Sequence, residues 1–243
     1  MANTSKAALA TILQSAVCRT RVKHRPAPSL FFFPGLSTQP VFDPSLFSWT
    51  KELESKRDVI LEEYKALRAK HPNSDYGSKE EHKLHEGKWD WNSYILKGKR
   101  QTDFAIHCPK TVEFLESLDS PTLMRGTPFS FAFFSTLHPH STIAPHYGPC
   151  NLRIRCHFPL IVPKSGKCGM QVGDKTVTWE EGKPVLFDDC YEHKVWNETD
   201  EERVLLLFDL WYVISAVFSI VSRLYLLYQV SIFYMMIFLS LCV

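Results

Sequence analysis

Basic side chains cluster in one short stretch of this 243-residue sequence, NLRIRCHFPLIV, which begins at Asn151. Alternate residues of a β-strand point to opposite faces, so Arg153, Arg155 and His157 would share one face. Three adjacent basic groups repel one another, and burying them without partners would be strongly destabilising. This face therefore either contacts water or lines a cavity that receives an anion.

A fourth basic group favours the cavity. Arg203 begins another apolar stretch, RVLLLFDLW, and lies ten residues after His193. Guanidinium groups bind carboxylates through two parallel N–H bonds. Two guanidinium groups beside one pocket would suit a small dicarboxylate.

Two histidines lie next to these basic groups in the sequence. His146 precedes the basic stretch and His193 follows the FDDC turn, so a sheet that folds over could bring the two imidazoles face to face. Imidazole is the commonest metal ligand in proteins. Such a pair is weak evidence by itself, but together with Arg155, His157 and Arg203 it is much more specific for a metal and anion site.

Short β-strands are the elements that would position these groups. From Phe129 onward the apolar residues follow a period of two, which is typical of strands. The strand-like stretches are FSFAFFSTL, NLRIRCHFPLIV, MQV, KTVTW, PVLF, HKVWN and RVLLLFDLW. This succession, separated by turns, predicts a sandwich or barrel with a β-core over residues 129–211.

Helices are predicted before the β-core. Residues 47–70 repeat apolar side chains every three or four positions, which indicates a helix, and residues 110–118 do the same. Between them lie a polar loop at 71–88 and a strand, WDWNSYIL. The sequence therefore predicts a mainly β fold that is covered by N-terminal helices.

The two ends of the chain differ from this core. Residues 1–40 contain Lys and Arg but no acidic residue, which predicts a flexible basic segment or a targeting segment. In the hydrophobic tail at 212–243, Arg223 is the only charged residue. Residues 224–243 are uncharged, and a helix of that length would span ~30 Å. The tail is therefore a candidate transmembrane anchor, with a buried apolar helix or extension as the alternative.

Composition narrows the possible functions. The net charge of +2 comes without a long run of Lys or Arg, so the chain gives no reason to expect nucleic-acid binding. The cysteines contain no Cys-x-x-Cys spacing, which argues against a zinc ribbon or a thioredoxin-like motif. Cys150 and Cys156 could pair in an oxidising compartment, although ordinary packed thiols are the stronger expectation.

Three stretches in this order resemble the aspartyl/asparaginyl β-hydroxylase family: APHYGPCNLRIRCHFPLIVPKSG, WEEGKPVLFDDCYEHKVWN and RVLLLFDLW. The resemblance is greatest to the separate hydroxylase-domain-containing members and runs from Pro34 to Trp211. It implies a double-stranded β-helix (jelly-roll, cupin-like) fold in residues 41–211. It also implies an Fe(II)- and 2-oxoglutarate-dependent dioxygenase that hydroxylates the β-carbon of Asp or Asn residues in a protein substrate.

The resemblance also implies roles for individual residues. His146 and His193 would be the iron ligands, and Arg203 would hold the far carboxylate of 2-oxoglutarate. The remaining co-substrate contacts would be Ser135, Arg155 and His157.

The family typically has a glycine where related oxygenases place a third, carboxylate ligand, and Gly148 matches this pattern. The absence of the carboxylate ligand would leave room for water and would make the metal centre more positive. Asp188 and Asp189 could accept hydrogen bonds from groups around the metal, although an ordinary turn at a strand end is the stronger expectation for them.

The same resemblance implies molecular oxygen as a co-substrate, protein substrates with EGF-like domains as candidates, and a membrane-associated location with the endoplasmic reticulum as a candidate. A C-terminal anchor, however, would leave the domain in the cytosol. After Trp211 the sequence departs from the family, because YVISAVFSIV replaces a polar ending. Two alternatives stay open: a non-catalytic, membrane-tethered β-helix binding module, and a cupin-like binder of another metal such as zinc.

Overall fold

The computed structural model describes residues 26–212, except residues 31, 34, 35, 37, 38, 78–83 and 120. The predictions for residues 1–25 and 213–243, including the apolar C-terminal helix and the anchor at 224–243, lie outside the described residues. Within them, no helix has both the length and the apolar character needed to cross a bilayer.

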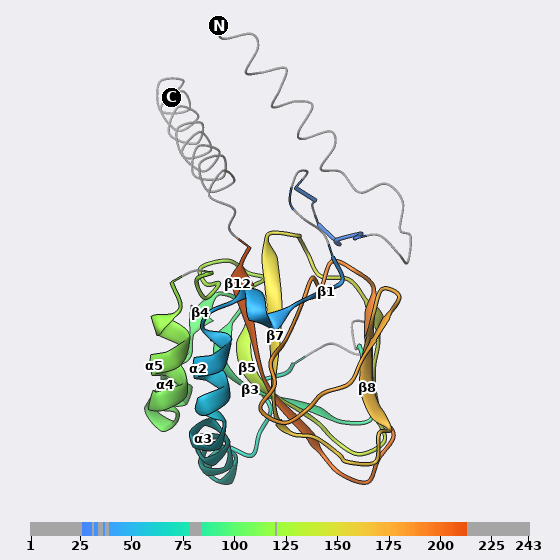
Figure 1. Cartoon of the computed structure of the whole chain (residues 1–243). Helices are drawn as coiled ribbons and strands as arrows, with labels where there is room; N and C mark the ends of the chain where they lie inside the picture. The colour runs from blue at the N-terminus through green and yellow to red at the C-terminus, as the bar shows by residue number, and fades with distance from the viewer. Residues whose placement is uncertain are drawn as a thin grey trace, which may run out of the picture. The chain divides into compact units, whose positions relative to one another are not determined.

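The chain forms two antiparallel β-sheets that lie face to face (Figure 1). The larger sheet consists, in spatial order, of β1 (Val41–Phe42), β10 (Val185–Phe187), β7 (Arg153–Ile161), β12 (Arg203–Trp211), β5 (Ala132–Leu137), β3 (Trp89–Leu96) and β4 (Lys99–Arg100). The smaller sheet consists of β2 (His85–Glu86), β6 (Ser141–His146), β11 (His193–Asn197), β8 (Cys168–Val172) and β9 (Lys175–Val177). Side chains from both sheets form one hydrophobic core, in which Phe133 and Leu207 belong to the same cluster as Met170 and Val195.

The strands from β5 to β12 are divided between the two sheets, and the chain passes from one sheet to the other at every step except from β8 to β9. β5, β7, β10 and β12 belong to the larger sheet, whereas β6, β8, β9 and β11 belong to the smaller one. Eight antiparallel strands wound in this way form a jelly roll, or double-stranded β-helix. The predicted mainly β fold with a jelly-roll core is therefore confirmed.

Helices cover the outer face of the larger sheet (Figure 1). They are the 3₁₀ helix η1 (Pro44–Leu46) and the α-helices α2 (Thr50–Ser55), α3 (Arg57–Lys70), α4 (Thr102–His107) and α5 (Pro109–Ser117). Tyr64 of α3 contacts Phe134 of β5, with ring centroids 5.2 Å apart, and Trp49 contacts Phe208 of β12, with centroids 5.9 Å apart. Because β12 is covered on both faces, its sequence is a nearly continuous apolar run.

The structure differs from the predicted elements at several points. The helix predicted over residues 47–70 is two helices, which meet at Lys56. α4 and β6 were not predicted, because α4 is only six residues long and β6 ends with Ala144, Pro145 and His146, which are at least partly exposed. The last strand is intact to its end, since Trp211 pairs with Arg153 of β7.

Part of the predicted flexible N-terminal segment is ordered. The backbone N–H of Ala27 donates to the carbonyl of Cys190 at 2.8 Å, and that of Ser29 donates to the carbonyl of Gly148 at 2.8 Å. These residues therefore pack along the loops that flank the jelly roll. Cys150 and Cys156 are buried free thiols.

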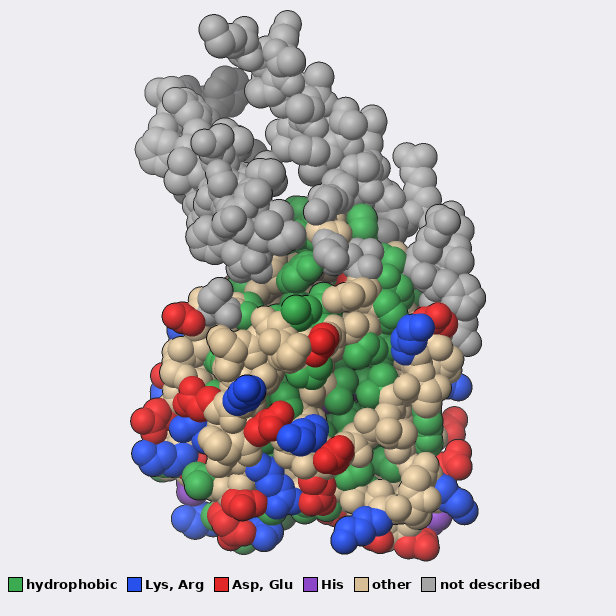
Figure 2. Space-filling view, in the orientation of Figure 1, with side chains coloured by type: hydrophobic (Ala, Val, Ile, Leu, Met, Phe, Trp, Pro, Cys, Tyr) green, Lys and Arg blue, Asp and Glu red, His purple; other side chains and the backbone are tan. Residues whose placement is uncertain are grey.

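Charged side chains have different surroundings at the surface and in the interior of the protein. On the face shown in Figure 2, acidic and basic side chains are interspersed over the helices, and hydrophobic side chains gather beside them. Ion pairs at the surface include Lys183 with Glu54, at 2.8 Å. By contrast, Arg153, Arg155 and Arg203 lie mostly or completely inside the protein. The cost of burying each charge there depends on the groups that pair with it.

A side chain from α3 caps helix α5. Cys108 at the N-terminus of α5 makes no side-chain capping bond. Instead, the Glu63 carboxylate accepts hydrogen bonds from the backbone N–H groups of Lys110 and Thr111, both at 2.8 Å, and from the Thr111 hydroxyl at 2.6 Å. This contact satisfies N–H groups that a helix start otherwise leaves without partners.

We expect Glu63→Ala to lower the free energy of unfolding by about 1–2 kcal/mol, because the first turn of α5 loses its capping carboxylate. Glu62→Ala is the matched control: Glu62 is exposed and pairs with Lys65, so its loss should cost less than about 0.5 kcal/mol. Urea unfolding of both variants measures the difference. Equal costs would show that the capping contact contributes nothing.

Candidate active site

One cavity between the two sheets contains all six of the predicted site residues. The residues that line it are Trp89, Ser135, Ile143, His146, Arg155, His157, His193, Val195, Arg203 and Leu207. Residues that lie far apart in the sequence are thus brought together by the jelly-roll winding.

The two histidines come together because β6 and β11 are adjacent strands. His146 and His193 are directly paired across them, and their ring centroids are 4.0 Å apart. Nδ1 of His146 lies 2.8 Å from the carbonyl oxygen of Ala144, and Nδ1 of His193 lies 3.0 Å from that of Tyr191. A carbonyl can only accept, so each Nδ1 carries a proton and each neutral ring keeps a lone pair on Nε2 for a metal.

The surroundings favour the neutral form of both rings. Removal from water lowers the pKa of His146, and burial lowers the pKa of His193 well below its usual value, with the neighbouring His146 ring adding to the effect. Both imidazoles are therefore neutral at neutral pH, which is the form that binds metals.

Two internal carboxylates neutralise the basic face of β7. Arg155 donates from Nε and Nη2 to Asp209, at 2.8 and 3.0 Å. Arg153 donates from Nη1 to Asp209 at 3.1 Å and pairs with Asp189 through Nε and Nη2. Arg153 and Arg155 are therefore neutralised within the protein, although Arg155 also lines the cavity as expected. The sequence did not predict these pairs, because neither carboxylate is near the arginines in sequence.

Asp189 fills the space beside Gly148. A Cβ on Gly148 would lie 2.3–2.5 Å from the Asp189 carboxylate, which is too close for any side chain. Burial alone would raise the pKa of Asp189, but the Arg153 guanidinium lowers it below the usual range. The expectation of room for water and a more positive centre at Gly148 is therefore wrong, since an ionised carboxylate from another loop occupies that space.

Arg203 has a different environment from the other two arginines. It is 1% exposed, and its one hydrogen bond within the described residues runs from Nη1 to the Ser135 hydroxyl at 3.5 Å. Nε and Nη2 are buried without a partner. Burial lowers the pKa of Arg203 to about 10, so the guanidinium is still charged at neutral pH and free to bind an anion.

His157 is a second unpaired group in the same cavity. It is buried, and its Nδ1 has no hydrogen-bond partner in the described part of the chain. Burial, with the Arg203 charge adding to it, holds the pKa of His157 well below its usual value. A neutral imidazole beside an unpaired guanidinium can donate a further hydrogen bond to an anion.

Among the residues that sequence reasoning missed, Trp89 and Asp209 make polar contacts with predicted site residues. Trp89 lines the cavity, and its indole N–H donates to the Ser135 hydroxyl at 2.9 Å. Asp209 supplies the counter-charge for β7. The alternation of Trp89 and Trp91 along one strand could have identified the first, but no pattern in the sequence pairs Asp209 with Arg155.

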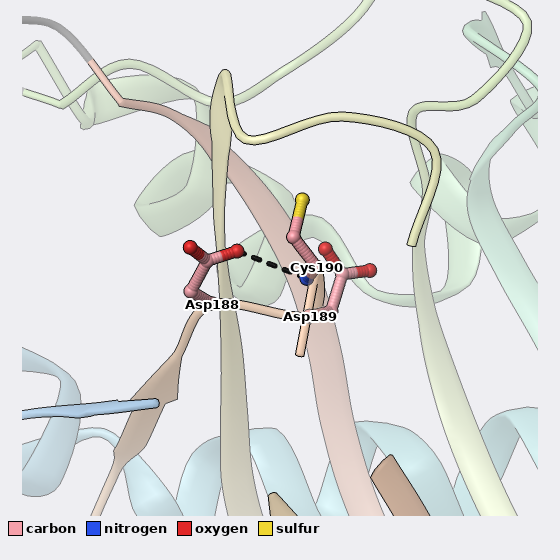
Figure 3. A group of neighbouring side chains, drawn as sticks. All are labelled: Asp188, Asp189 and Cys190. Carbon is pink, nitrogen blue, oxygen red and sulfur yellow. Dashed lines mark hydrogen bonds between the residues drawn. The ribbon is translucent and has the colours of Figure 1, made fainter. Parts of the chain in front are cut away.

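A separate acidic group lies beside the site. Asp188, Asp189 and Cys190 form a group of three side chains of metal-ligating types, and their ligand atoms lie within 4.8 Å of one another. Within the described part of the chain this is the only such group of three or more. Figure 3 shows the Asp188 carboxylate bound to the Cys190 backbone N–H on one side of the loop, with the Asp189 carboxylate on the other side. Because Asp189 is engaged by Arg153, this arrangement is a structural turn with a neutralising carboxylate.

The comparison with known proteins matches this site to a family. The sequence profile of the aspartyl/asparaginyl β-hydroxylases matches residues 54–212. The chain belongs to this family. The human aspartyl/asparaginyl β-hydroxylase is 34% identical over 189 residues, which cover 76% of this chain and 24% of the human protein. The predicted family is thereby confirmed, and with it membership of a group of oxidoreductases.

Two further relatives are similar over the same region. Rat aspartate β-hydroxylase domain-containing protein 2 is 33% identical over 190 residues, covering 76% of this chain and 54% of the relative. The ornithine lipid ester-linked acyl 2-hydroxylase of Rhizobium tropici is 31% identical over 180 residues, which cover 72% of this chain and 61% of the relative. The chain thus spans between 24% and 61% of the length of these three relatives, whose names imply different substrates.

The loop beside the site predicts a pH-dependent stability. Burial raises the pKa of Asp188 from 3.8 to about 7, so the folded protein keeps a proton that the unfolded chain releases. The free energy of unfolding should therefore fall as pH rises from about 4 to 7, by on the order of 2–4 kcal/mol from this group. Asp188→Asn should remove this slope, because the amide is neutral throughout and can still accept from Cys190.

Urea unfolding at pH 4.5 and pH 8 would measure this difference. Asp200→Asn is the control, since Asp200 is fully solvated and should leave the slope unchanged. A slope in Asp188→Asn equal to that of the wild-type protein would contradict the assignment.

Proposed function

We propose that this chain is an Fe(II)- and 2-oxoglutarate-dependent dioxygenase that hydroxylates the β-carbon of Asp or Asn residues in a protein substrate. One observation carries the proposal: two neutral imidazoles with ring centroids 4.0 Å apart share a cavity with a buried guanidinium that has no carboxylate partner. A ferrous ion and a diacid would satisfy both. Membership of the β-hydroxylase family supports the same reaction.

The histidines fit a ferrous ion. His146 and His193 would bind it through Nε2, because their Nδ1 atoms are held by the Ala144 and Tyr191 carbonyls. Imidazole ligands suit Fe(II), and a site with few protein ligands leaves positions open for co-substrate and oxygen. When bound, the iron supplies the activation of oxygen, coupled to conversion of 2-oxoglutarate into succinate and CO₂.

Arg203 fits the far carboxylate of 2-oxoglutarate. Its unpaired Nε and Nη2 can donate two parallel bonds to a carboxylate, and the Ser135 hydroxyl and His157 lie beside them in the cavity. Arg155 also lines the cavity, but its Nε and Nη2 are bound to Asp209. We therefore assign the principal contact to Arg203 and a supporting one to Arg155.

The apolar side chains of the cavity exclude water from the reaction. Ile143, Val195 and Leu207 line the cavity together with the indole of Trp89. Electrostatic interactions are stronger where water is excluded, so the guanidinium discriminates strongly between a diacid and a neutral ligand. A zinc-binding module or a tethered binding module would not need this unpaired charge.

Turnover is tested directly with purified protein, Fe(II), ascorbate, 2-oxoglutarate and EGF-like domain peptides. The proposal predicts succinate together with a mass gain of one oxygen atom on an Asp or Asn of the peptide. Succinate without peptide oxidation would support the dioxygenase activity but exclude these peptides as its substrate. Folded, iron-loaded protein that forms no succinate would contradict the proposal and favour the binding module.

Loss of either imidazole should abolish metal binding. We expect His146→Ala and His193→Ala to bind Fe(II) at least about 100-fold more weakly than the wild-type protein, because each removes one of two protein ligands. His140→Ala is the control, since His140 is exposed and pairs with Asp200. Metal titration under anaerobic conditions measures the affinities, and unchanged affinity in either ligand variant would exclude that residue.

Loss of the guanidinium should affect the co-substrate and spare the metal. We expect Arg203→Ala to raise the 2-oxoglutarate requirement at least about tenfold, because a buried charge-assisted pair is lost, while Fe(II) affinity stays within about twofold. Arg125→Ala, at an exposed arginine, is the control. Unchanged 2-oxoglutarate affinity in Arg203→Ala would show that the carboxylate is bound elsewhere.

We also propose that the protein associates with a membrane through its tail. The support is the run of 20 uncharged residues at 224–243. Full-length protein should sediment with membranes, and a form that ends at residue 211 should stay in the supernatant. Equal distribution of the two forms between membranes and supernatant would contradict the proposed anchor.

A further inference from the structure

The buried charge of Arg203 raises a question that the proposed function does not answer. Arg153 and Arg155 are neutralised by Asp189 and Asp209, as buried charges require. Arg203 has one contact to the Ser135 hydroxyl, at 3.5 Å, and no carboxylate partner among the described residues. Something other than an anion must reduce the cost of burying this guanidinium before a ligand arrives.

Trp179 lies directly against the guanidinium. The Cζ atom of Arg203 is 5.1 Å from the centroid of the Trp179 ring, and a desolvated contact of this kind is among the stronger cation–π interactions. The same indole contacts His157, with ring centroids 6.0 Å apart and planes at 39°. Trp179 therefore packs against both unpaired groups of the site but does not itself line the cavity.

The turn that follows Trp179 is fixed at several points. The N–H of Gly182 donates to the carbonyl of Pro159 at 2.9 Å. Glu181 accepts from the N–H of Val162 at 3.0 Å and pairs with Arg57 at 2.6 Å. These bonds tie the turn to the end of β7 and to α3, so the position of the indole is set by the jelly roll and its helical cover.

We propose that Trp179 is the positioning residue that makes this site selective for a diacid, an inference that rests on the proposed function. A guanidinium is planar, and its N–H donors lie in that plane. An aromatic ring can therefore stabilise the cation through its face and leave the in-plane donors Nε and Nη2 free for a carboxylate. A carboxylate in the place of Trp179 would neutralise the charge and compete with the ligand, as Asp209 does at Arg155.

The inference predicts a selective loss of affinity. Trp179→Leu should weaken binding of 2-oxoglutarate at least about tenfold, because the guanidinium loses both stabilisation and orientation. Binding of 2-oxobutyrate, which has the same skeleton without the far carboxylate, should change less than about threefold. Trp179→Phe, which keeps an aromatic face, should retain 2-oxoglutarate affinity within about threefold.

Isothermal titration of the full chain loaded with Mn(II) measures both ligands without turnover. Trp49→Leu is the matched control, because it removes another buried tryptophan that packs on Phe208 away from the cavity. That variant should lose thermal stability but keep the ratio of the two affinities. Thermal unfolding of each variant establishes that the protein is folded before titration.

Each other outcome would overturn the inference in a distinct way. Equal weakening of both ligands in Trp179→Leu would reduce Trp179 to a packing residue, and unchanged affinity for both ligands would show that Trp179 does not act on the site. A selective loss in Trp179→Phe as large as in Trp179→Leu would assign the effect to the indole N–H. A wild-type protein that binds neither ligand would reject the proposed function and this inference together.

Discussion

A surplus of buried positive charge is the constraint on which the interior of this protein depends. The described interior between the sheets holds three arginines, Arg153, Arg155 and Arg203, against two engaged carboxylates, Asp189 and Asp209. Burying an unpaired charge is costly, and the proposed diacid would supply the partner that Arg203 lacks among the described residues. Ile143, Val195 and Leu207 line the same cavity, and the low polarity of these side chains strengthens the attraction between the remaining guanidinium and an anion.

The jelly-roll winding sets the geometry of both halves of the site. The pairing of β6 with β11 places His146 opposite His193, and β12 brings Arg203 to the same cavity from the opposite sheet. The helices contribute indirectly, because they bury the outer face of β12 and leave its inner face to the site. The residues proposed to hold the metal and the co-substrate thus come from different sheets, and the packing of the sheets fixes the distance between them.

Much of this could be predicted from the sequence, and the failures have physical causes. The strand-like stretches of the sequence identified β3, β11 and β12 with their observed bounds, because strands in a buried core carry strong alternation or continuous apolar runs. β6 was missed because Ala144 and Pro145 in its C-terminal half are exposed and interrupt the apolar pattern. The six site residues were found through spacing and family resemblance, whereas Asp209, Asp189 and Trp179 act through contacts that only the fold creates.

A structure of the Mn(II)-loaded protein with 2-oxoglutarate would show whether the two histidines and Arg203 hold a metal and a diacid in one cavity. We expect the metal on Nε2 of His146 and His193, with the far carboxylate of the diacid on Nε and Nη2 of Arg203 and the Trp179 ring still on the guanidinium face. A diacid whose far carboxylate displaces Asp209 from Arg155 and leaves Arg203 without a partner would contradict this expectation.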